Sequence, residues 1–547
     1  MTTTMLAPPA APGRAQKAVL LRPTAQAGPR DPVGAVAASA RPAQDEGKPS
    51  RFTHLPGLSL MVVILAVQAA LSAVFLHANT AFGDEALYLW AGHLEWAHWL
   101  HGTVIPDFPT WFSGSPVVYP PVGALADSIG GLAGARALSL CFMLGATCLV
   151  WGTTARLFGR RAAFFAAALF AVIGPTLHLG AFATYDPMAL FLLALAAWCA
   201  CGARTREDAT GWMLACAAAL ALANATKYAS MLYDPVVIVM AVLAACPNPG
   251  GKAALRRAAL LITCLAGLLA ILLRLGGSWY ITGIAQTTTM RPNGADSASK
   301  VLGESWQWLA VVVGTALAGL VVSLIRRNRG AVTCLVALLF GAALLAPAEQ
   351  ARIQTTVSLG KHVDFGAWFA CIAGGYALSA LASLPRPKMA QAIAAACLSM
   401  AIVPVAAEGL LQARAMVNWP GAGRLITYLR PLTSHGGHFL ADTDDVPEYY
   451  LPATTWQQWS NVFSITRQGR VLDEHGSLAP YQKAIKQHYF SLVILNFANT
   501  PVKDNAITAA LRSTPGYTLI KSVPYTGPVA GSYTIWAYRP DTKTAGP

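Results

Sequence analysis

Two adjacent acids, Asp84 and Glu85, come shortly after the first long apolar run of the sequence, residues 58–77. A carboxylate is costly to place in hydrocarbon, so both side chains are expected at the surface of a membrane. There a carboxylate can take a proton from a hydroxyl group or orient hydroxyl groups through hydrogen bonds. A simpler interpretation also fits, in which the pair only begins a helix and interacts with its dipole.

A third acid and a lysine stand beside later apolar runs. Asp186 precedes Pro187, a pair typical of a helix N-terminus, so capping alone would explain this acid. Lys227 lies in a very short polar segment, where its side chain could simply extend to the interface. It also suits the phosphate group of a lipid carrier, which needs positive charge at headgroup depth. We count Tyr88 and Tyr228 with Lys227 as candidates for substrate binding.

Three further candidates for phosphate binding, Arg352, Lys361 and His362, stand just before a late apolar run. Extension to the interface explains them about as well as a phosphate contact. A metal ion is not required, because basic side chains can meet a phosphate's charge. Asp84, Glu85 and Asp186 could still gather a divalent ion with oxygen ligands. None of the 10 cysteines forms a C-x-x-C pair, so a cysteine zinc site is not expected.

The elements that must position these residues are membrane helices. The sequence is 55% hydrophobic and 12% charged, whereas soluble domains are about 25% charged. Spanning the hydrocarbon takes roughly 20 apolar residues. We therefore expect about eleven spans in an all-α polytopic membrane protein, at 58–77, 135–154, 162–180, 186–203, 210–224, 228–246, 255–273, 306–325, 331–347, 364–383 and 389–410.

The distribution of charge predicts the orientation of these spans. The net charge is +14, but most basic residues lie in the tail or in short segments between apolar runs, so nucleic-acid binding is not expected. A cytoplasmic N-terminus would place nearly all of the basic loops inside, as the positive-inside rule requires. An odd number of spans then places the C-terminal part outside the cell.

The chain divides into three predicted regions. Residues 1–57 have the composition of a disordered cytoplasmic tail, and 58–410 form the transmembrane domain. Its first outer loop, 78–134, is rich in aromatic residues and predicts interfacial helices, with Tyr119-Pro-Pro marking a rigid extended stretch. Residues 415–547 predict a small extracytoplasmic α/β domain. Its candidate strands are 439–440, 490–494 and 533–538.

Several short motifs recur together in one known group of proteins. They are Asp84-Glu85, Tyr119-Pro-Pro, Ala135-Arg136, Arg156-Leu-Phe-Gly-Arg160-Arg161, Tyr185-Asp186-Pro and Thr226-Lys227-Tyr. In this order, the motifs resemble those of GT-C membrane glycosyltransferases of the protein O-mannosyltransferase and lipid A aminoarabinose transferase type, which are glycosyltransferase family 39-like. The resemblance covers roughly residues 58–410.

The resemblance implies inverting transfer of a hexosyl or pentosyl group from a polyprenyl-phosphate donor to a hydroxyl of a protein, lipid or cell-wall glycan. Asp84 would be the general base, and Glu85 and Asp186 would orient hydroxyl groups. Lys227 would meet the departing phosphate, with Lys361, His362 and Arg352 as further candidates. No cofactor is required, although a divalent metal is possible. High Ala, Gly and Arg usage suggests a bacterial plasma membrane.

The main alternative is a flippase or transporter for a lipid-linked sugar. Transporters often contain inverted repeats and buried charges near the middle of the membrane. No internal repeat is visible here, and the ionisable residues gather at the outer ends of the spans. This arrangement favours catalysis at one face over transport. A scaffold without catalytic activity would leave Asp84, Asp186 and Lys227 without a role.

Overall fold

The computed structural model describes residues 55–540, except 203–208, 245–250, 292, 327–329, 385–386, 468–469, 474–476 and 499. Of the predicted tail, residues 1–57, the first 54 residues lie outside the described part of the chain.

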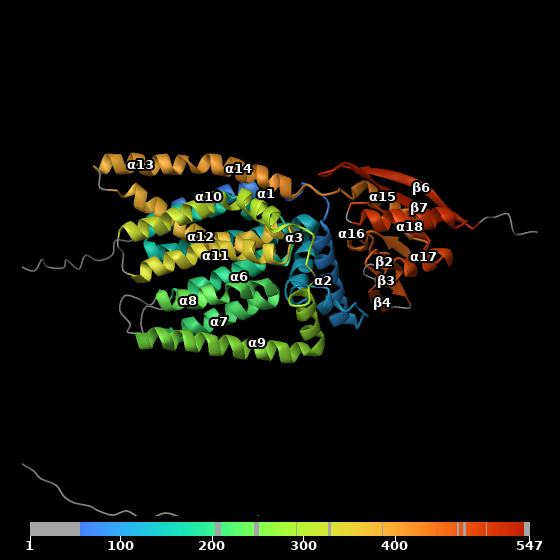
Figure 1. Ribbon diagram of the computed structural model, residues 1–547, viewed down its shortest axis with the longest axis horizontal. Helices are drawn as coiled ribbons and strands as arrows, with labels where there is room; N and C mark the ends of the chain where they lie inside the picture. The colour runs from blue at the N-terminus through green and yellow to red at the C-terminus, as the bar shows by residue number, and fades with distance from the viewer. Residues whose placement is uncertain are drawn as a thin grey trace, which may run out of the picture. The chain divides into compact units, whose positions relative to one another are not determined.

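The predicted apolar runs fold into a bundle of helices, which Figure 1 shows running alongside one another. Every one of the eleven predicted runs overlaps one of these helices or a consecutive pair. The helices are α1 (Leu55–Ala73), α3 (Tyr119–Phe158), α4 (Arg160–Val172), α5 (Gly174–Leu179), α6 (Tyr185–Ala200), α7 (Ala209–Thr226), α8 (Asp234–Leu243), α9 (Gly251–Thr287), α10 (Ala298–Ile325), α11 (Gly330–Arg352), α12 (Leu359–Ala382), α13 (Lys388–Met400) and α14 (Ile402–Met416).

Length and composition identify the spanning helices. Among the described residues, seven helices are long and apolar enough to cross a membrane, with α13 and α14 counted as one. Three shorter apolar helices accompany them, namely most of α1, α6 and the segment 228–243. The chain is therefore a multi-pass membrane protein, as the sequence predicts.

Helix α12 lies at the centre of the bundle, and its N-terminal turn carries Lys361. The helix is the most buried of the seven long apolar helices, because glycines let its neighbours approach closely. A Cβ atom at Gly366 would lie 2.6 Å from the backbone oxygen of Ala342, and one at Gly375 would lie 2.4 Å from that of Ala162. Close packing on both sides fixes the place of Lys361.

The segment predicted as the first outer loop, residues 78–134, contains α2 (Gly83–His101) and the short 3₁₀ helix η1 (Phe108–Thr110). Its helical character is as predicted, but the extended stretch at Tyr119-Pro-Pro is not found. Pro120 and Pro121 lie instead in the first turn of α3, where proline is tolerated because those backbone N–H groups have no helical partner. The helix α3 then kinks at Gly130 and Gly131.

Beyond the bundle, the chain forms a mixed sheet with the strand order β2-β1-β5-β7-β6. Strands β2, β1 and β5 are parallel, whereas β5, β7 and β6 are antiparallel. All three predicted strands are present, as β1, β5 and β7. The strands are β1 (Phe439–Ala441), β2 (Trp459–Asn461), β5 (Leu492–Leu495), β6 (Tyr517–Tyr525) and β7 (Gly531–Tyr538), with a separate hairpin of β3 (Ser464–Arg467) and β4 (Arg470–Asp473).

Helices cover both faces of this sheet. Alternate residues of β1 point to opposite sides, so Phe439 packs with α15 (Gly423–Thr433) and Leu440 packs with α17 (Ala479–Lys486) and α18 (Pro501–Ser513). The short helix α16 (Asp445–Tyr450) and the turn η3 (Trp456–Gln458) connect β1 to β2. The result is an α/β layer structure of the kind predicted for this part of the chain.

Candidate active site

Four charged side chains from four segments form one cluster. Asp84 lies in the first turn of α2, Asp186 in the first turn of α6, and Lys361 in the first turn of α12. Lys227 lies between α7 and the 3₁₀ helix η2 (Tyr228–Tyr233). The Nζ atom of Lys361 donates to Oδ2 of Asp84 and lies 3.8 Å from Oδ2 of Asp186. The sequence separates these residues widely, and the fold brings them together.

Asp186 is held from two sides. Its Oδ1 accepts a hydrogen bond from Nζ of Lys227 at 2.5 Å, and its Oδ2 accepts one from the Thr184 hydroxyl at 3.0 Å. Lys227 also lies 4.7 Å from the centre of the Tyr185 ring, over its face. The charges therefore alternate in the order Asp84, Lys361, Asp186 and Lys227. Asp186 and both lysines are buried, whereas Asp84 is about one third exposed.

Glu85 has a different place from its neighbour Asp84. Both of its carboxylate oxygens accept from the Arg136 guanidinium, at 2.8 and 2.7 Å, and both residues are buried. The backbone N–H groups of Ala183 and Phe82 donate to the same carboxylate. Arg136 in turn donates to the backbone oxygens of Leu76, Asn79 and Thr80. This network joins α2 and α3 to the segment before α6, which carries Asp186.

Aromatic rings lie beside the charged cluster. The ring of Tyr88 stacks on that of Tyr185 at 4.5 Å and meets the edge of Phe112 at 5.2 Å. Burial, with Asp84 nearby, raises the pKa of Tyr88 well above its ordinary value, so its hydroxyl stays protonated. The Tyr228 hydroxyl is buried and has no hydrogen-bond partner among the described residues. The hydroxyl of Tyr228 is thus available to a polar ligand, whereas that of Tyr88 is hydrogen-bonded to Tyr185.

The two remaining predicted residues, His362 and Arg352, differ in their distance from the charged cluster. The Nδ1 atom of His362 is hydrogen-bonded to the side-chain amide of Gln350, and the ring lies within electrostatic reach of Asp186 and Lys227. The side chain of Arg352 is 65% exposed and forms an ion pair with Glu349. The fold brings His362 to the edge of the cluster and leaves Arg352 in a separate surface pair.

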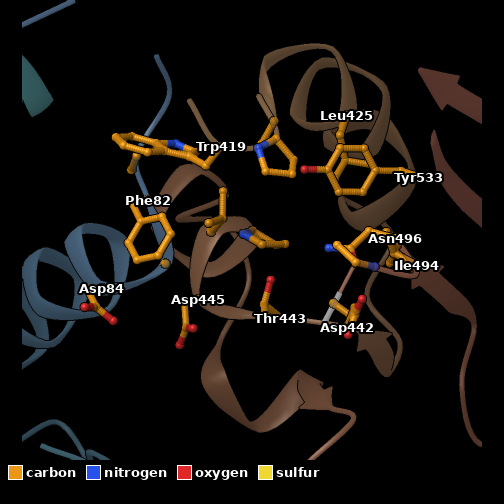
Figure 2. Close-up of a pocket in the computed structure, with 18 residues that line it drawn as sticks. Phe82, Asp84, Trp419, Leu425, Asp442, Thr443, Asp445, Ile494, Asn496 and Tyr533 are labelled. Carbon is orange, nitrogen blue, oxygen red and sulfur yellow. The ribbon is translucent and has the colours of Figure 1, made fainter. Parts of the chain in front are cut away.

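A cavity of about 280 Å³ adjoins Asp84 on the side of the sheet. Figure 2 shows Asp84 and Asp445 on one side of it and Asp442, Asn496 and Tyr533 on the other. Phe82 and Trp419 also line it, with their ring centres 5.3 Å apart. Of these lining residues, only Asp84 is predicted from the sequence as a site residue. The acidic run Asp442-Thr-Asp-Asp445 directly after a strand was the available signal.

The three acids predicted as possible metal ligands are not unpaired carboxylates grouped around one position. Asp84, Glu85 and Asp186 are each paired with a different cation, namely Lys361, Arg136 and Lys227. Within the described part of the chain, three other acids bring one oxygen each within 4.8 Å of one another: Asp444, Asp445 and Glu448. Burial and mutual repulsion raise the pKa of Asp445 and of Glu448 well above the usual carboxyl range.

Comparisons with known proteins agree with this architecture. The family model described as dolichyl-phosphate-mannose-protein mannosyltransferase matches residues 124–275. The structure is similar to that of ArnT from Cupriavidus metallidurans bound to undecaprenyl phosphate, with a TM-score of 0.56 and 15% identity over 89% of this chain and 99% of ArnT. No curated protein matches the chain.

A second similar structure is that of the archaeal oligosaccharyltransferase AglB from Archaeoglobus fulgidus, in complex with an inhibitory peptide and a dolichol-phosphate. Its TM-score is 0.54, with 12% identity over 88% of this chain and 74% of AglB. The chain therefore has the GT-C fold of membrane glycosyltransferases, as its motifs predict.

Proposed function

We propose that the protein transfers a sugar from a polyprenyl-phosphate donor to an acceptor hydroxyl at the outer face of the plasma membrane, with inversion at the anomeric carbon. The observation that carries this proposal is the contact of Lys361 with Asp84 and its proximity to Asp186. A partly exposed carboxylate thus contacts one buried cation, and a second buried cation, Lys227, pairs with Asp186. The GT-C fold supports the choice of donor, since ArnT binds undecaprenyl phosphate and AglB binds a dolichol-phosphate.

In the proposed reaction, the acceptor oxygen attacks C1 of the donor sugar from the side opposite the phosphate. Asp84 takes the proton of the acceptor hydroxyl as the new C1–O bond forms. Such general-base assistance contributes about 10²–10⁴-fold in rate. The bond between C1 and the phosphate oxygen breaks with its electron pair remaining on the phosphate.

The departing phosphate gains negative charge in the transition state, and nearby cations stabilise it there. Lys227 and Lys361 are suited to this role because both are buried beside Asp186. Asp186 then serves to position the two ammonium groups, and it can also orient sugar hydroxyls. Glu85 acts through Arg136 as a positioning residue, since its carboxylate contacts Arg136 and two backbone N–H groups.

The topology belongs to the same proposal. Residues 1–57 would be a cytoplasmic tail, 58–410 the transmembrane domain and 415–547 an extracytoplasmic domain. The positive-inside distribution of Lys and Arg supports this orientation. The sugar would be a hexose or a pentose, and the acceptor a protein, a lipid or a cell-wall glycan.

Purified protein in nanodiscs, supplied with polyprenyl-phosphate sugars and an acceptor extract, tests the proposal. We expect release of free polyprenyl phosphate and a product whose anomeric configuration, measured by NMR, is opposite to that of the donor. Movement of the intact donor across a vesicle membrane without its consumption would support a flippase instead. Retention of configuration would contradict the single-displacement reaction.

A further inference from the structure

The cavity beside Asp84 lies at the carboxyl ends of two adjacent parallel strands of the sheet. Strands β1 and β5 are parallel and adjacent, so their carboxyl ends lie at the same edge. Asp442 and Thr443 follow β1 directly, Asn496 follows β5, and all three line the cavity. From β1 the chain crosses to β2 on one side and later returns to β5 on the other. Ligands of open α/β sheets bind outside the carboxyl ends of strands at such a reversal.

The lining combines polar groups with aromatic faces. Asp442, Asn496 and Tyr533 offer carboxylate, amide and hydroxyl groups, while Phe82 and Trp419 offer ring faces. Asp442 is buried, its Oδ1 accepts a hydrogen bond from the Thr500 hydroxyl, and its carboxyl group is hydrogen-bonded to that of Asp504. The hydroxyl of Tyr533 and the amide of Asn496 line the cavity as well. Groups of this kind exchange hydrogen bonds with sugar hydroxyls.

The charge of the cavity limits what it can accept. Asp84, Asp442 and Asp445 line it, and no Lys or Arg is among its lining residues. Asp84 is paired with Lys361, but Asp442 and Asp445 form no ion pair in the described part of the chain. Burial raises the pKa of Asp442 and of Asp445 and so favours their neutral carboxyl forms, and a phosphate or carboxylate group would meet no Lys or Arg in the cavity. The cavity is therefore suited to an uncharged ligand rich in hydroxyl groups.

We propose that this cavity binds a neutral sugar residue of a glycan acceptor and presents its hydroxyl to Asp84. The inference rests on the proposed function and adds the class of acceptor. The volume of about 280 Å³ is just below that of most ligand sites, which run from about 300 to 1,000 Å³, and it suits a single terminal sugar ring. The sheet thus supplies one wall of the acceptor site, and the N-terminal end of α2 supplies the other.

Direct binding to the full chain in nanodiscs tests this inference by saturation-transfer NMR. The probes are neutral methyl glycosides of mannose, galactose, glucose and arabinose, with mannose 6-phosphate, glucose 6-phosphate and a serine- and threonine-rich peptide for comparison. We expect at least one neutral glycoside to bind saturably. Both sugar phosphates should bind roughly tenfold or more weakly, a difference of about 1.4 kcal/mol.

Two variants and two matched controls locate the site. Asp442→Asn and Tyr533→Phe should each weaken glycoside binding roughly tenfold, as loss of a hydrogen bond to a ligand does. Tyr525→Phe changes a neighbouring hydroxyl that donates to the Asn496 backbone oxygen. Asp444→Asn changes an acid that accepts from Asn461 and does not line the cavity. Both controls should retain wild-type binding, and thermal unfolding checks that every variant folds.

Four outcomes would overturn the inference: no neutral glycoside binds saturably, a sugar phosphate binds as tightly as the glycosides, the peptide binds where the glycosides do not, or Asp442→Asn behaves like Asp444→Asn. Donor turnover is measured separately through release of polyprenyl phosphate. Turnover without glycoside binding contradicts only the acceptor site. Glycoside binding without any turnover, across polyprenyl-phosphate sugars, contradicts only the proposed function.

Discussion

Asp84 and Asp186 are joined through a single ammonium group, that of Lys361, although they lie on different helices and 102 positions apart in the numbering. Lys361 contacts Asp84 and lies 3.8 Å from Asp186, while Lys227 holds the other oxygen of Asp186. Only Asp84 of these four is appreciably exposed. The arrangement gives the acids unequal roles, because only the exposed one can readily meet an incoming hydroxyl group.

Replacing Asp84 by asparagine tests the role of the general base. Asp84→Asn keeps the shape of the side chain but removes the proton acceptor, so kcat should fall by about 10²–10⁴-fold. Donor binding should change much less. Release of polyprenyl phosphate measures turnover, and Asp107→Asn, at an exposed acid of the segment between α2 and α3, is the control. Turnover at the wild-type rate in Asp84→Asn would remove Asp84 from this role.

Replacing Lys227 tests the phosphate contact. Lys227→Ala removes a buried cation beside Asp186, so binding of the polyprenyl-phosphate donor should weaken much more than binding of the acceptor. Separate KM values for the two substrates measure the difference. Lys300→Ala is a matched control, because Lys300 forms an exposed pair with Asp296. Equal losses for both substrates would argue against a phosphate contact.

Replacing Glu85 separates a positioning role from a catalytic one. Glu85→Gln leaves Arg136 as a buried charge without its partner, which costs about 3–5 kcal/mol, so the thermal unfolding temperature in detergent should fall clearly. Arg352→Gln breaks an exposed pair, which contributes about 0–1 kcal/mol, and serves as the control. A Glu85→Gln protein as stable as wild type but inactive would instead place Glu85 in the chemistry.

The bundle and the location of the cluster could be predicted from the sequence, because hydropathy and short motifs are local signals. Asp84, Asp186 and Lys227 stand out as charges beside apolar runs, and all three meet in the structure. Arg136 is also visible as a charge at the edge of a span, but its pairing with Glu85 depends on helix packing. The cavity beside the sheet could not be predicted, since it forms between segments far apart in sequence, such as Phe82, Trp419 and Asp442.

Removal of divalent ions tests whether lysine side chains, without a metal ion, neutralise the charge of the phosphate. Lys227 and Lys361 lie in the proposed phosphate site, and the acids Asp84 and Asp186 are already paired with them. Turnover should therefore persist in EDTA at the rate measured without it. The comparison is a titration with magnesium and manganese chloride after EDTA treatment. Loss of turnover that either metal restores would contradict this expectation and direct attention to Asp444, Asp445 and Glu448.

The sheet offers a prediction about pH through the acids Asp442 and Asp504. Burial and the nearby Asp442 raise the pKa of Asp504 to about 7 in the folded protein, whereas the unfolded chain has a value of about 3.9. The folded state therefore binds the proton more tightly. The contribution of this group to stability is fully present below pH ~3.9 and is lost as the pH rises through about 7.

The thermal unfolding temperature of the full chain should consequently fall between pH 5 and pH 9, followed by tryptophan fluorescence in detergent. Asp504→Asn cannot release a proton, so its unfolding temperature should depend less on pH over the same interval. Glu349→Gln, at a partly exposed acid of α11 that pairs with Arg352, should follow the wild type. If the unfolding temperatures of Asp504→Asn and of the wild type fall by the same number of degrees, Asp504 is not the acid that ionises. The same measurement on Asp442→Asn then shows whether Asp442, the other member of the pair, is that acid.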